Sequence, residues 1–306
     1  MSEPRRVLVT GASGFIGRHA LAPLLERGFD VCAVARRAPA GAPRAVAWLE
    51  ADLLDDAQRA AVVARAGATH LLHLAWYAEH GRFWQAPENV AWTAASVRLA
   101  QEFTAAGGRR AVMAGTCAEY AWGGAGALSE AASAVEPATL YGVCKDATRR
   151  VASQVVPQLA WGRVFFLYGP AEAPGRLVAS VARALVAGER AKTGDGTQVR
   201  DFLHVEDVAA AFAALLDSDA TGAVNIGSGE ARALREVIEA IGAAAGRPEL
   251  LDIGALAPRP GDPPQLVADV TRLRDEVRFA PAIGLREGIE RTVAWWRDQP
   301  RVLYSP

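Results

Sequence analysis

A glycine-rich turn between a short apolar run and a segment of helical length constrains the fold of this chain more than any other feature. The apolar patterning predicts a strand over residues 7–10, a helix over 15–27 and a second strand over 31–35. Three glycines, each three residues from the next, fill the turn between the first strand and the helix. A strand, a helix and a strand in this order form a crossover between parallel neighbours. The sequence therefore predicts a β-α-β unit here.

The same alternation continues along most of the chain. Further strands are predicted over residues 70–75, 111–115 and 163–167, helices over 89–106 and 141–156, and a strand over 223–226 that returns to the same sheet. The pattern predicts an α/β fold, a doubly wound parallel sheet of the Rossmann type with a second, smaller α/β domain. We expect residues 1–170, with 202–227 returning to them, to form the first domain, and residues 171–306 to form most of the second.

The glycine turn has the features of a phosphate-binding loop. Glycine lets the backbone approach a ligand closely, and the free amides and positive dipole end of the following helix suit a pyrophosphate. Six residues of the turn are candidate cofactor contacts: Gly11, Ser13, Gly14, Phe15, Ile16 and Gly17. Because the same glycine spacing occurs in plain structural turns, the inference depends on its position inside the β-α-β unit. On that basis the sequence predicts a dinucleotide cofactor.

The end of the second strand indicates which dinucleotide binds. A site for NAD usually has an acidic residue there, which binds the adenosine ribose. In this chain Ala35 takes that place, and Arg36 and Arg37 follow it. Two guanidiniums suit a 2'-phosphate, so NADP is predicted and NAD is less favoured; the alternative is that both arginines are solvated loop residues. Asp52, followed by Leu53, is a candidate contact for the adenine or a cap of the next helix.

Tyr141 and Lys145 are four residues apart at the start of a predicted helix, which places them one turn apart on one face. A fixed cation stabilises a phenolate, and we expect Lys145 to lower the pKa of Tyr141 toward the range useful for acid-base chemistry. The alternative is a surface tyrosine beside a solvated lysine. Thr116 follows the strand over 111–115 at its carboxyl end, where sites form in open α/β sheets; its hydroxyl is suited to bind a reacting oxygen or to cap a turn.

Composition excludes several classes of protein. The 306 residues include 33 basic and 34 acidic side chains, a net charge of -1, which leaves no basic excess for nucleic acid or an anionic membrane. Cys32, Cys117 and Cys144 are too far apart in sequence to predict a disulfide framework or a thiolate metal site. No apolar stretch approaches the ~20 residues of a membrane span, and no signal peptide is evident. We expect a cytoplasmic protein that binds small molecules and no metal.

Short motifs follow one another along the chain in a recognisable order. They are T-G-A-S-G-F-I-G from Thr10, H-L-A-W from His73, G-T-C-A-E-Y from Gly115, Y-G-V-C-K from Tyr141, F-F-L-Y-G-P from Phe165, V-R-D-F-L-H-V-E-D-V-A from Val199, N-I-G-S-G from Asn225 and R-P-G-D from Arg259. With these motifs the chain resembles the extended short-chain dehydrogenases/reductases, and among them the NAD-dependent epimerase/dehydratase family that acts on nucleotide sugars. The resemblance covers nearly the whole length.

The resemblance implies catalytic and cofactor-binding roles. The family's catalytic Ser/Thr, Tyr and Lys match Thr116, Tyr141 and Lys145. Tyr141 would donate or accept the proton, Thr116 would bind the carbonyl oxygen, and Lys145 would lower the pKa of the tyrosine and hold the nicotinamide ribose. Residues 1–170 would then be the dinucleotide-binding domain, and residues 171–306 mainly the substrate domain. Three residues after the strand over 70–75 would also lie near the cofactor, namely Leu74, Ala75 and Trp76.

The resemblance also implies contacts with the substrate. Five residues are candidates, namely Trp76, Cys117, Arg176, Arg200 and Arg259. Of these, Arg200 and Arg259 match arginines that bind the nucleotide diphosphate, a dianion well suited to bidentate guanidinium groups. An aromatic loop that includes Trp84 follows the strand over 70–75 on the expected substrate side. Its rings would pack on the sugar, or in the core or a dimer interface.

Departures from the family pattern favour one activity. Sugar dehydratases carry Asp-Glu directly after the catalytic threonine, where this chain has Cys117 and Ala118, so dehydration is disfavoured. Glu119 lies one place later, and we expect its side chain to point the other way. The predicted activity is NADPH-dependent reduction of a keto group, the 4-keto group of a nucleotide-linked 6-deoxy sugar. A nucleotide-sugar 4-epimerase and a non-catalytic NADP-binding sensor are the alternatives. The family pattern further predicts a homodimer formed through helices 89–106 and 141–156.

Overall fold

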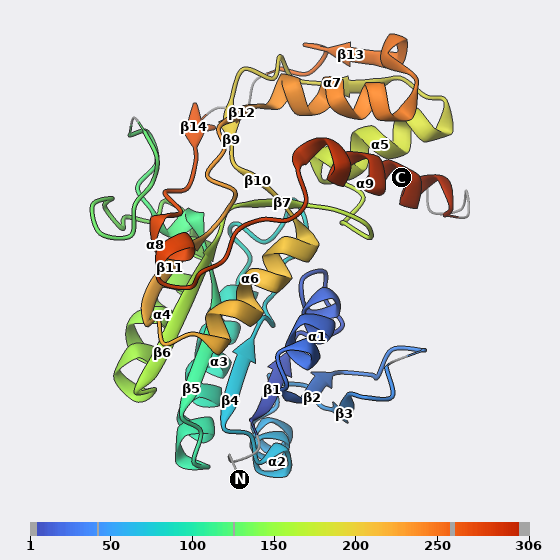
Figure 1. Cartoon of the computed structure of the whole chain (residues 1–306). Helices are drawn as coiled ribbons and strands as arrows, with labels where there is room; N and C mark the ends of the chain where they lie inside the picture. The colour runs from blue at the N-terminus through green and yellow to red at the C-terminus, as the bar shows by residue number, and fades with distance from the viewer. Residues whose placement is uncertain (1–4, 42, 125, 258–260, 300–306) are drawn as a thin grey trace.

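A sheet of seven parallel strands forms the centre of the larger part of the molecule (Figure 1). The computed structural model describes residues 5–41, 43–124, 126–257 and 261–299. In spatial order the strands are β11 (Gly222–Ile226), β6 (Gln158–Val164), β5 (Arg110–Thr116), β4 (His70–His73), β1 (Arg6–Thr10), β2 (Asp30–Ala35) and β3 (Ala47–Glu50). This is the Rossmann order 3-2-1-4-5-6 with β11 added beside β6. The predicted fold class and the return of residues 223–226 to the sheet are confirmed.

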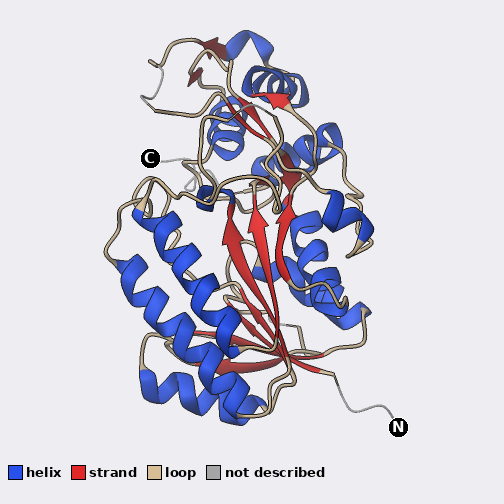
Figure 2. Ribbon diagram, turned by 90° about the vertical axis from the view of Figure 1, so that its left-hand side faces the viewer, coloured by secondary structure: helices blue, strands red, loops and turns tan. Residues whose placement is uncertain are grey.

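Helices cover both faces of the sheet (Figure 2). On one face lie α1 (Gly17–Glu26) and α6 (Val205–Asp217); on the other lie α2 (Asp56–Ala66), α3 (Glu88–Ala105) and α4 (Leu140–Val155). Because successive side chains of a strand point to opposite faces, each strand contributes to both layers of core.

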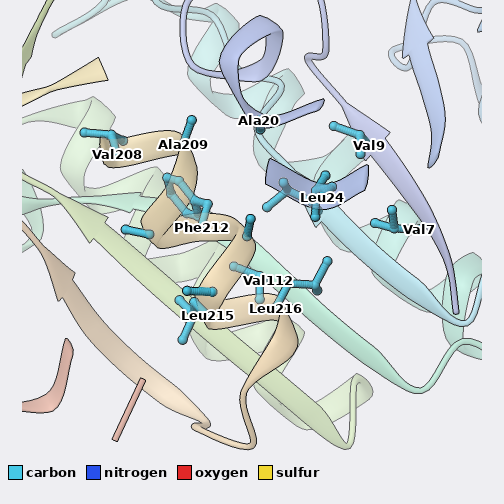
Figure 3. Packing of buried hydrophobic residues seen from close by; sticks show 14 of the residues in the cluster. Val7, Val9, Ala20, Leu24, Val112, Val208, Ala209, Phe212, Leu215 and Leu216 are labelled. Carbon is cyan, nitrogen blue, oxygen red and sulfur yellow. The ribbon is translucent and has the colours of Figure 1, made fainter. Parts of the chain in front are cut away.

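Strand β1 illustrates this division of the core. Val7 and Val9 pack toward α1 and α6, where Leu24 and Phe212 meet them (Figure 3), whereas Leu8 packs with the helices of the opposite face. All five side chains are fully buried. Each contributes about 1.5–3 kcal/mol relative to an exposed side chain. The carboxyl ends of the strands, where the site lies, are thus supported by packed core on both faces of the sheet.

A smaller part packs over the carboxyl ends of the strands (Figure 1). Its core is formed by α5 (Leu177–Ala187), α7 (Leu234–Ala245) and α9 (Leu285–Arg297). The remaining elements are short: β7 (Phe166–Tyr168), β8 (Ala191–Thr193), β9 (Val199–Arg200), β10 (Phe202–His204), β12 (Arg232–Ala233), β13 (Leu251–Ile253), β14 (Gln265–Leu266), α8 (Thr271–Asp275), and the 3-10 turns η1 (Cys117–Glu119) and η2 (Pro248–Leu250). The predicted division into a dinucleotide-binding and a substrate domain stays a prediction.

Two predicted strands have different limits from those expected. The strand predicted over 163–167 is wrong as a single element, because β6 ends at Val164 and β7 pairs with β10 in a separate sheet. The cause is the hydrogen bonding after Val164: the Phe166 amide donates to the Asp201 carbonyl, away from the main sheet. The strand predicted over 70–75 ends at His73, and Leu74 and Ala75 follow it as irregular backbone packed against Gly11.

Candidate active site

The site lies where the order of strands reverses. The chain leaves β1 toward β2 on one side and later returns to β4 on the other, so the crevice between β1 and β4 opens at their carboxyl ends. Ligands of open α/β sheets bind at such a reversal. Thr10 ends β1 and His73 ends β4, and their side chains are joined by a 2.7 Å hydrogen bond.

The glycine turn packs tightly against the segment after β4. Gly11 has a φ of +68°, and a Cβ there would lie 2.7 Å from the Ala75 nitrogen. A Cβ on Gly17 would lie 2.1 Å from the Gly11 carbonyl oxygen. Only glycine therefore fits at these two positions. Ile16, the N-cap residue of α1, makes no side-chain cap, and the Arg18 and His19 amides of the first turn donate to the Gly14 and Ile16 carbonyls. The positive end of the helix dipole still points from this turn toward a bound anion. The turn fits the pyrophosphate of a dinucleotide.

The rest of this turn has the exposure that a ligand contact needs. Ser13 and Gly14 are exposed, and Phe15 is half-buried. On the other side of the turn, Leu74 and Ala75 are half-buried. The structure thus brings together the two segments that the sequence assigned separately to a cofactor.

The end of β2 carries two exposed arginines. Arg36 and Arg37 form no ion pair with another described residue, which leaves both guanidiniums available to an anion. A carboxylate that the sequence reading missed lies beside them: Glu50 is paired in register with Ala35, and it accepts a 3.0 Å hydrogen bond from the Ala38 amide. The only signal for it is the β2–β3 register, which a single sequence does not reveal.

Asp52 does not cap the next helix. The N-cap of α2 is Asp55, which accepts from the Gln58 amide. Asp52 instead accepts a 3.0 Å bond from the Leu54 amide and stays exposed, while Leu53 is buried. The alternative of Asp52 as a helix cap is therefore wrong, and its contact with adenine stays a prediction.

Thr116, Tyr141 and Lys145 converge at the carboxyl end of β5. Thr116 is the last residue of β5, and α4 carries the other two. The side chain of Thr116 lies near enough to the Tyr141 phenol to lower its pKa. The Lys145 ammonium donates a 2.8 Å bond to the Ala114 carbonyl and lies 5.9 Å from the centre of the Tyr141 ring.

Gly142 makes this convergence possible. A Cβ on Gly142 would lie 2.4 Å from the Ala118 carbonyl oxygen, so α4 approaches the turn after β5 as closely as backbones allow. Thr139, the N-cap of α4, accepts from the Gly142 amide and fixes the start of the helix. The tight approach places Tyr141 against Thr116.

Burial changes the titration of both members of the pair. Burial raises the pKa of Tyr141 above its ordinary value, and the nearby Thr116 side chain opposes this only in part. The expected lowering of the Tyr141 pKa by Lys145 is therefore wrong for this state. Burial also lowers the pKa of Lys145 to about 7, against an opposing attraction from Glu119. The ammonium makes its contacts with the Ala114 carbonyl and the Trp76 ring rather than with the phenol oxygen.

Aromatic rings surround Tyr141. The ring centres of Phe83, Trp84 and Trp76 lie 4.9, 6.0 and 6.5 Å from that of Tyr141, all near-perpendicular to it. Trp76 also lies under the Lys145 ammonium, 3.8 Å from ring centre to Nζ. Trp84 is 38% exposed, so the aromatic wall reaches solvent on one side.

The aromatic loop is tied to the catalytic helix. Buried Asn89 accepts from the Trp76 indole and donates to the Phe83 carbonyl, which fixes the loop internally. The Trp84 carbonyl accepts from the Tyr141 amide at 3.1 Å. This bond satisfies an amide of the first turn of α4, which has no partner within the helix. Loop and helix are therefore expected to move together.

The candidate substrate residues lie on the side of the smaller part. Arg176 is half-buried at the N-cap of α5, and its positive charge lowers the pKa of Tyr141. Arg200 is buried and pairs with Asp262 at 2.6 Å. Asp262 of the R-P-G-D motif therefore lies beside Arg200, whereas Arg259 lies outside the described residues and its substrate contact stays a prediction.

Cys117 is buried beside Thr116, and burial raises the pKa of its thiol to about 12. A protonated thiol is a poor nucleophile, so Cys117 serves at most as a neutral contact. The three cysteines are free thiols. In the part of the chain that the structure describes, no group of three His, Cys, Asp or Glu side chains is arranged to hold a metal ion. Nor is any described helix both long and apolar enough to span a membrane.

Comparisons with known proteins agree with this geometry. The dTDP-4-dehydro-6-deoxy-D-allose reductase of Streptomyces bikiniensis is 34% identical over 142 residues, but the match spans only 44% of this chain and 42% of that protein. The dTDP-6-deoxy-L-talose 4-dehydrogenase (NAD(P)(+)) of Kitasatospora kifunensis is 29% identical over 94% of both chains. The crystal structure of the UDP-glucose 4-epimerase of Thermus thermophilus in complex with NAD has a TM-score of 0.85 and 30% identity, and the match covers 96% of this chain and 100% of that one.

A family-wide comparison gives the assignment. The profile described as "NAD dependent epimerase/dehydratase family" matches residues 7–227, which include the glycine turn, the end of β5 and the Tyr141–Lys145 pair. The chain belongs to the NAD-dependent epimerase/dehydratase family.

Proposed function

We propose that this protein reduces a keto group of a nucleotide-linked 6-deoxy sugar, the 4-keto group, with NADPH. The observation that carries the proposal is the convergence of Thr116, the last residue of β5, with Tyr141 and Lys145 of α4 at the carboxyl ends of the strands, where the Gly142 Cβ position is 2.4 Å from the Ala118 carbonyl and Lys145 Nζ is 2.8 Å from the Ala114 carbonyl. The likeness to a 4-dehydro sugar reductase and to a 6-deoxy sugar 4-dehydrogenase supports the class of substrate.

The cofactor proposal rests on the residues that line the crevice. The amides of the glycine turn would bind the pyrophosphate, and Arg36 and Arg37 would bind the 2'-phosphate of NADPH. Asp52 and Leu53 would lie at the adenine. When bound there, NADPH would supply a hydride to the carbonyl carbon.

The side chains of the site are suited to deliver the accompanying proton. Thr116 Oγ1 accepts a hydrogen bond from the Ala118 amide, which leaves the hydrogen of its hydroxyl to be donated to the ketone oxygen of the substrate. Tyr141, whose pKa burial raises, keeps its proton at neutral pH. A protonated phenol beside an oriented hydroxyl suits protonation of a ketone oxygen. Lys145 would bind the nicotinamide ribose and stabilise the phenolate left after the transfer.

The substrate would extend from Tyr141 toward the smaller part. Arg176, Arg200 and Arg259 would bind the nucleotide diphosphate, and Cys117 and Trp76 would contact the sugar. Because the Trp84 side of the wall is apolar, the sugar face that packs on it is expected to lack hydroxyls. With this placement, residues 1–170 would bind the dinucleotide and residues 171–306 would bind most of the substrate.

A 4-epimerase is the second candidate, supported by the likeness to the epimerase of Thermus thermophilus. The same three residues would then remove and return the proton in one catalytic cycle. Dehydration is disfavoured, since Cys117 and Ala118 stand where the family's dehydratases have Asp-Glu. Exposed valines on α3 and α4, Val90, Val143 and Val151, support the predicted homodimer through these helices. A cytoplasmic location stays a prediction.

One experiment separates these activities. The protein is incubated with NADPH, and separately with NADH, together with a panel of nucleotide-linked 4-keto-6-deoxy sugars, and the absorbance of reduced nicotinamide is followed. We expect stoichiometric consumption of NADPH with at least one keto sugar. Interconversion of non-keto sugars without net consumption would favour the epimerase. NADPH binding without either reaction would favour the sensor.

A further inference from the structure

Glu119 is a fully buried carboxylate at the base of the candidate site. Its Oε1 accepts from the Thr116 amide at 2.9 Å and from the Trp161 indole at 2.8 Å. Its Oε2 accepts from Arg163 Nε at 2.8 Å, with side-chain exposures of 2% for Arg163 and 0% for Glu119. Burying an ion pair away from water costs free energy, and a buried ion pair with a purely structural role is often replaceable by apolar residues without loss of stability. The pair is therefore a candidate for a functional role.

The surrounding backbone is shaped to admit this pair. A Cβ on Gly115 would lie 2.7 Å from Glu119 Oε1 and 2.0 Å from the Trp161 indole nitrogen. Gly115 is paired in register with Arg163 across β5 and β6. A glycine at this position leaves room for the carboxylate to reach under the strand end. The Glu119 side chain is thus directed beneath the strand end, toward Trp161 and Arg163 of β6, and the expectation that it points away from the site stays a prediction.

Glu119 and Lys145 are both buried against the end of β5: Lys145 Nζ donates to the Ala114 carbonyl at 2.8 Å, and Glu119 Oε1 accepts from the Thr116 amide, two residues further along the strand, at 2.9 Å. Consistent with this placement, the charge of Glu119 raises the pKa of Lys145 against the effect of burial and raises the pKa of Tyr141. Among the groups facing Lys145 from other elements, His73 of β4 is buried with its pKa lowered to about 3, so it is neutral at physiological pH. Arg163 of β6 faces Glu119 from the far side. Glu119 thus contributes a buried negative charge that favours the Lys145 ammonium.

We propose that Glu119 is a positioning residue that fixes Thr116 through its backbone amide and serves as the buried counter-charge of the Lys145 ammonium. Its importance for turnover rests on the proposed function. The effect of Glu119 on the Lys145 ammonium does not rest on the proposed function, because it requires no substrate.

The two halves of the proposal are separable by substitution. Glu119→Gln keeps an oxygen for the Thr116 amide and the Trp161 indole, which share Oε1, but removes the charge. Glu119→Asp keeps the charge but is one methylene too short for the Thr116 amide. Asp207→Asn is the matched control, since Asp207 is a buried carboxylate of α6 that accepts two backbone amides on the opposite face of the sheet.

The charge is tested by NMR on protein labelled with ¹³C at the lysine Cε. The chain contains only two lysines, Lys145 and the exposed Lys192, and Lys192→Arg assigns the two signals. In Glu119→Gln we expect the titration midpoint of Lys145 to fall by about one pH unit. Two references accompany this variant. The Lys192 midpoint should stay unchanged in Glu119→Gln, and the Lys145 midpoint should stay unchanged in Asp207→Asn and in Glu119→Asp. An unchanged Lys145 midpoint in Glu119→Gln overturns the counter-charge.

The position is tested by turnover with NADPH and the keto sugar identified above. We expect Glu119→Asp to lower kcat by about tenfold with little change in KM, since a displaced Thr116 acts on the transition state. We expect the alkaline limb of kcat in Glu119→Gln to move to lower pH with the Lys145 midpoint. Wild-type kcat in Glu119→Asp overturns the positioning role. If Glu119→Gln does not fold, the kcat of Glu119→Asp alone still decides whether Glu119 positions Thr116. Should the wild-type protein reduce no keto sugar, the proposed function fails, while the NMR titration still decides the role of Glu119.

Discussion

The close approach of α4 to the turn after β5 gives the most specific prediction. Gly142 follows Tyr141 directly, and its Cβ position lies 2.4 Å from the Ala118 carbonyl oxygen and 2.9 Å from Pro137 Cβ. An ordinary contact begins at 3.4 Å, so Gly142→Ala must push the backbones apart by about 1 Å. The shift acts on the interface that presses Tyr141 against Thr116.

The expected effects on activity and on stability differ in size. A displacement of about 1 Å in a reacting group costs roughly 100-fold in rate. Overpacking costs about 1–3 kcal/mol of unfolding free energy, and the better helix propensity of alanine offsets about 1 kcal/mol. The net loss of stability is then ~0–2 kcal/mol, a decrease in Tm of a few degrees. The variant should stay folded and lose most of its turnover.

The assay compares kcat, NADPH affinity and Tm of Gly142→Ala with those of Gly242→Ala. Gly242 is a buried glycine inside α7, and the closest atom to its Cβ position, at 2.7 Å, is the end of the Leu251 side chain. We expect Gly242→Ala to keep wild-type kcat. Wild-type kcat in Gly142→Ala, in a protein whose Tm is little changed, would refute the reasoning.

Two further predictions concern the cofactor and the response to pH. Replacing both Arg36 and Arg37 by Ala should weaken NADPH binding about tenfold or more, because charge-assisted hydrogen bonds to one phosphate would be lost, and should leave NADH binding nearly unchanged. Fluorescence titration measures both affinities, and replacement of exposed Arg44 is the control. Equal weakening of NADPH and NADH binding would contradict the assignment. Glu172 is 3% exposed, its Oε2 has no partner among the described residues, and burial raises its pKa from 4.5 to about 8. Its folded-state pKa is raised, so its contribution to stability is full below pH 4.5 and is lost as the pH rises through about 8. The Tm of the wild type should therefore fall relative to that of Glu172→Gln over this window, and parallel pH profiles would exclude the buried proton.

Most of the fold follows from local patterns in the sequence. The unbroken apolar run of Val7, Leu8 and Val9 indicates a strand buried on both faces, and the glycine turn indicates the start of the helix that follows. The split between Val164 and Phe166 was not predictable, because both sides of it are equally apolar. What divides them is the hydrogen bond from the Phe166 amide to Asp201, a residue far along the chain.

The catalytic trio was predictable from spacing and motifs, but its electrostatics were not. The raised pKa of Tyr141 arises from burial under Phe83 and Trp84, residues almost sixty positions away. Likewise, the role of Glu119 depends on Arg163, which the strand register brings beside it. Contacts of this kind depend on tertiary structure, which one sequence does not reveal.

The central claim is that Tyr141 transfers the proton in a reaction of bound NADPH. The most direct measurement is kcat together with the NADPH dissociation constant for Tyr141→Phe, with Thr116→Val measured alongside. Because the phenol ring and its aromatic contacts remain, we expect the dissociation constant to stay at the wild-type value. Turnover should fall by about 10²–10⁴-fold, the range supplied by general acid catalysis. Turnover within a few fold of wild type would contradict the account.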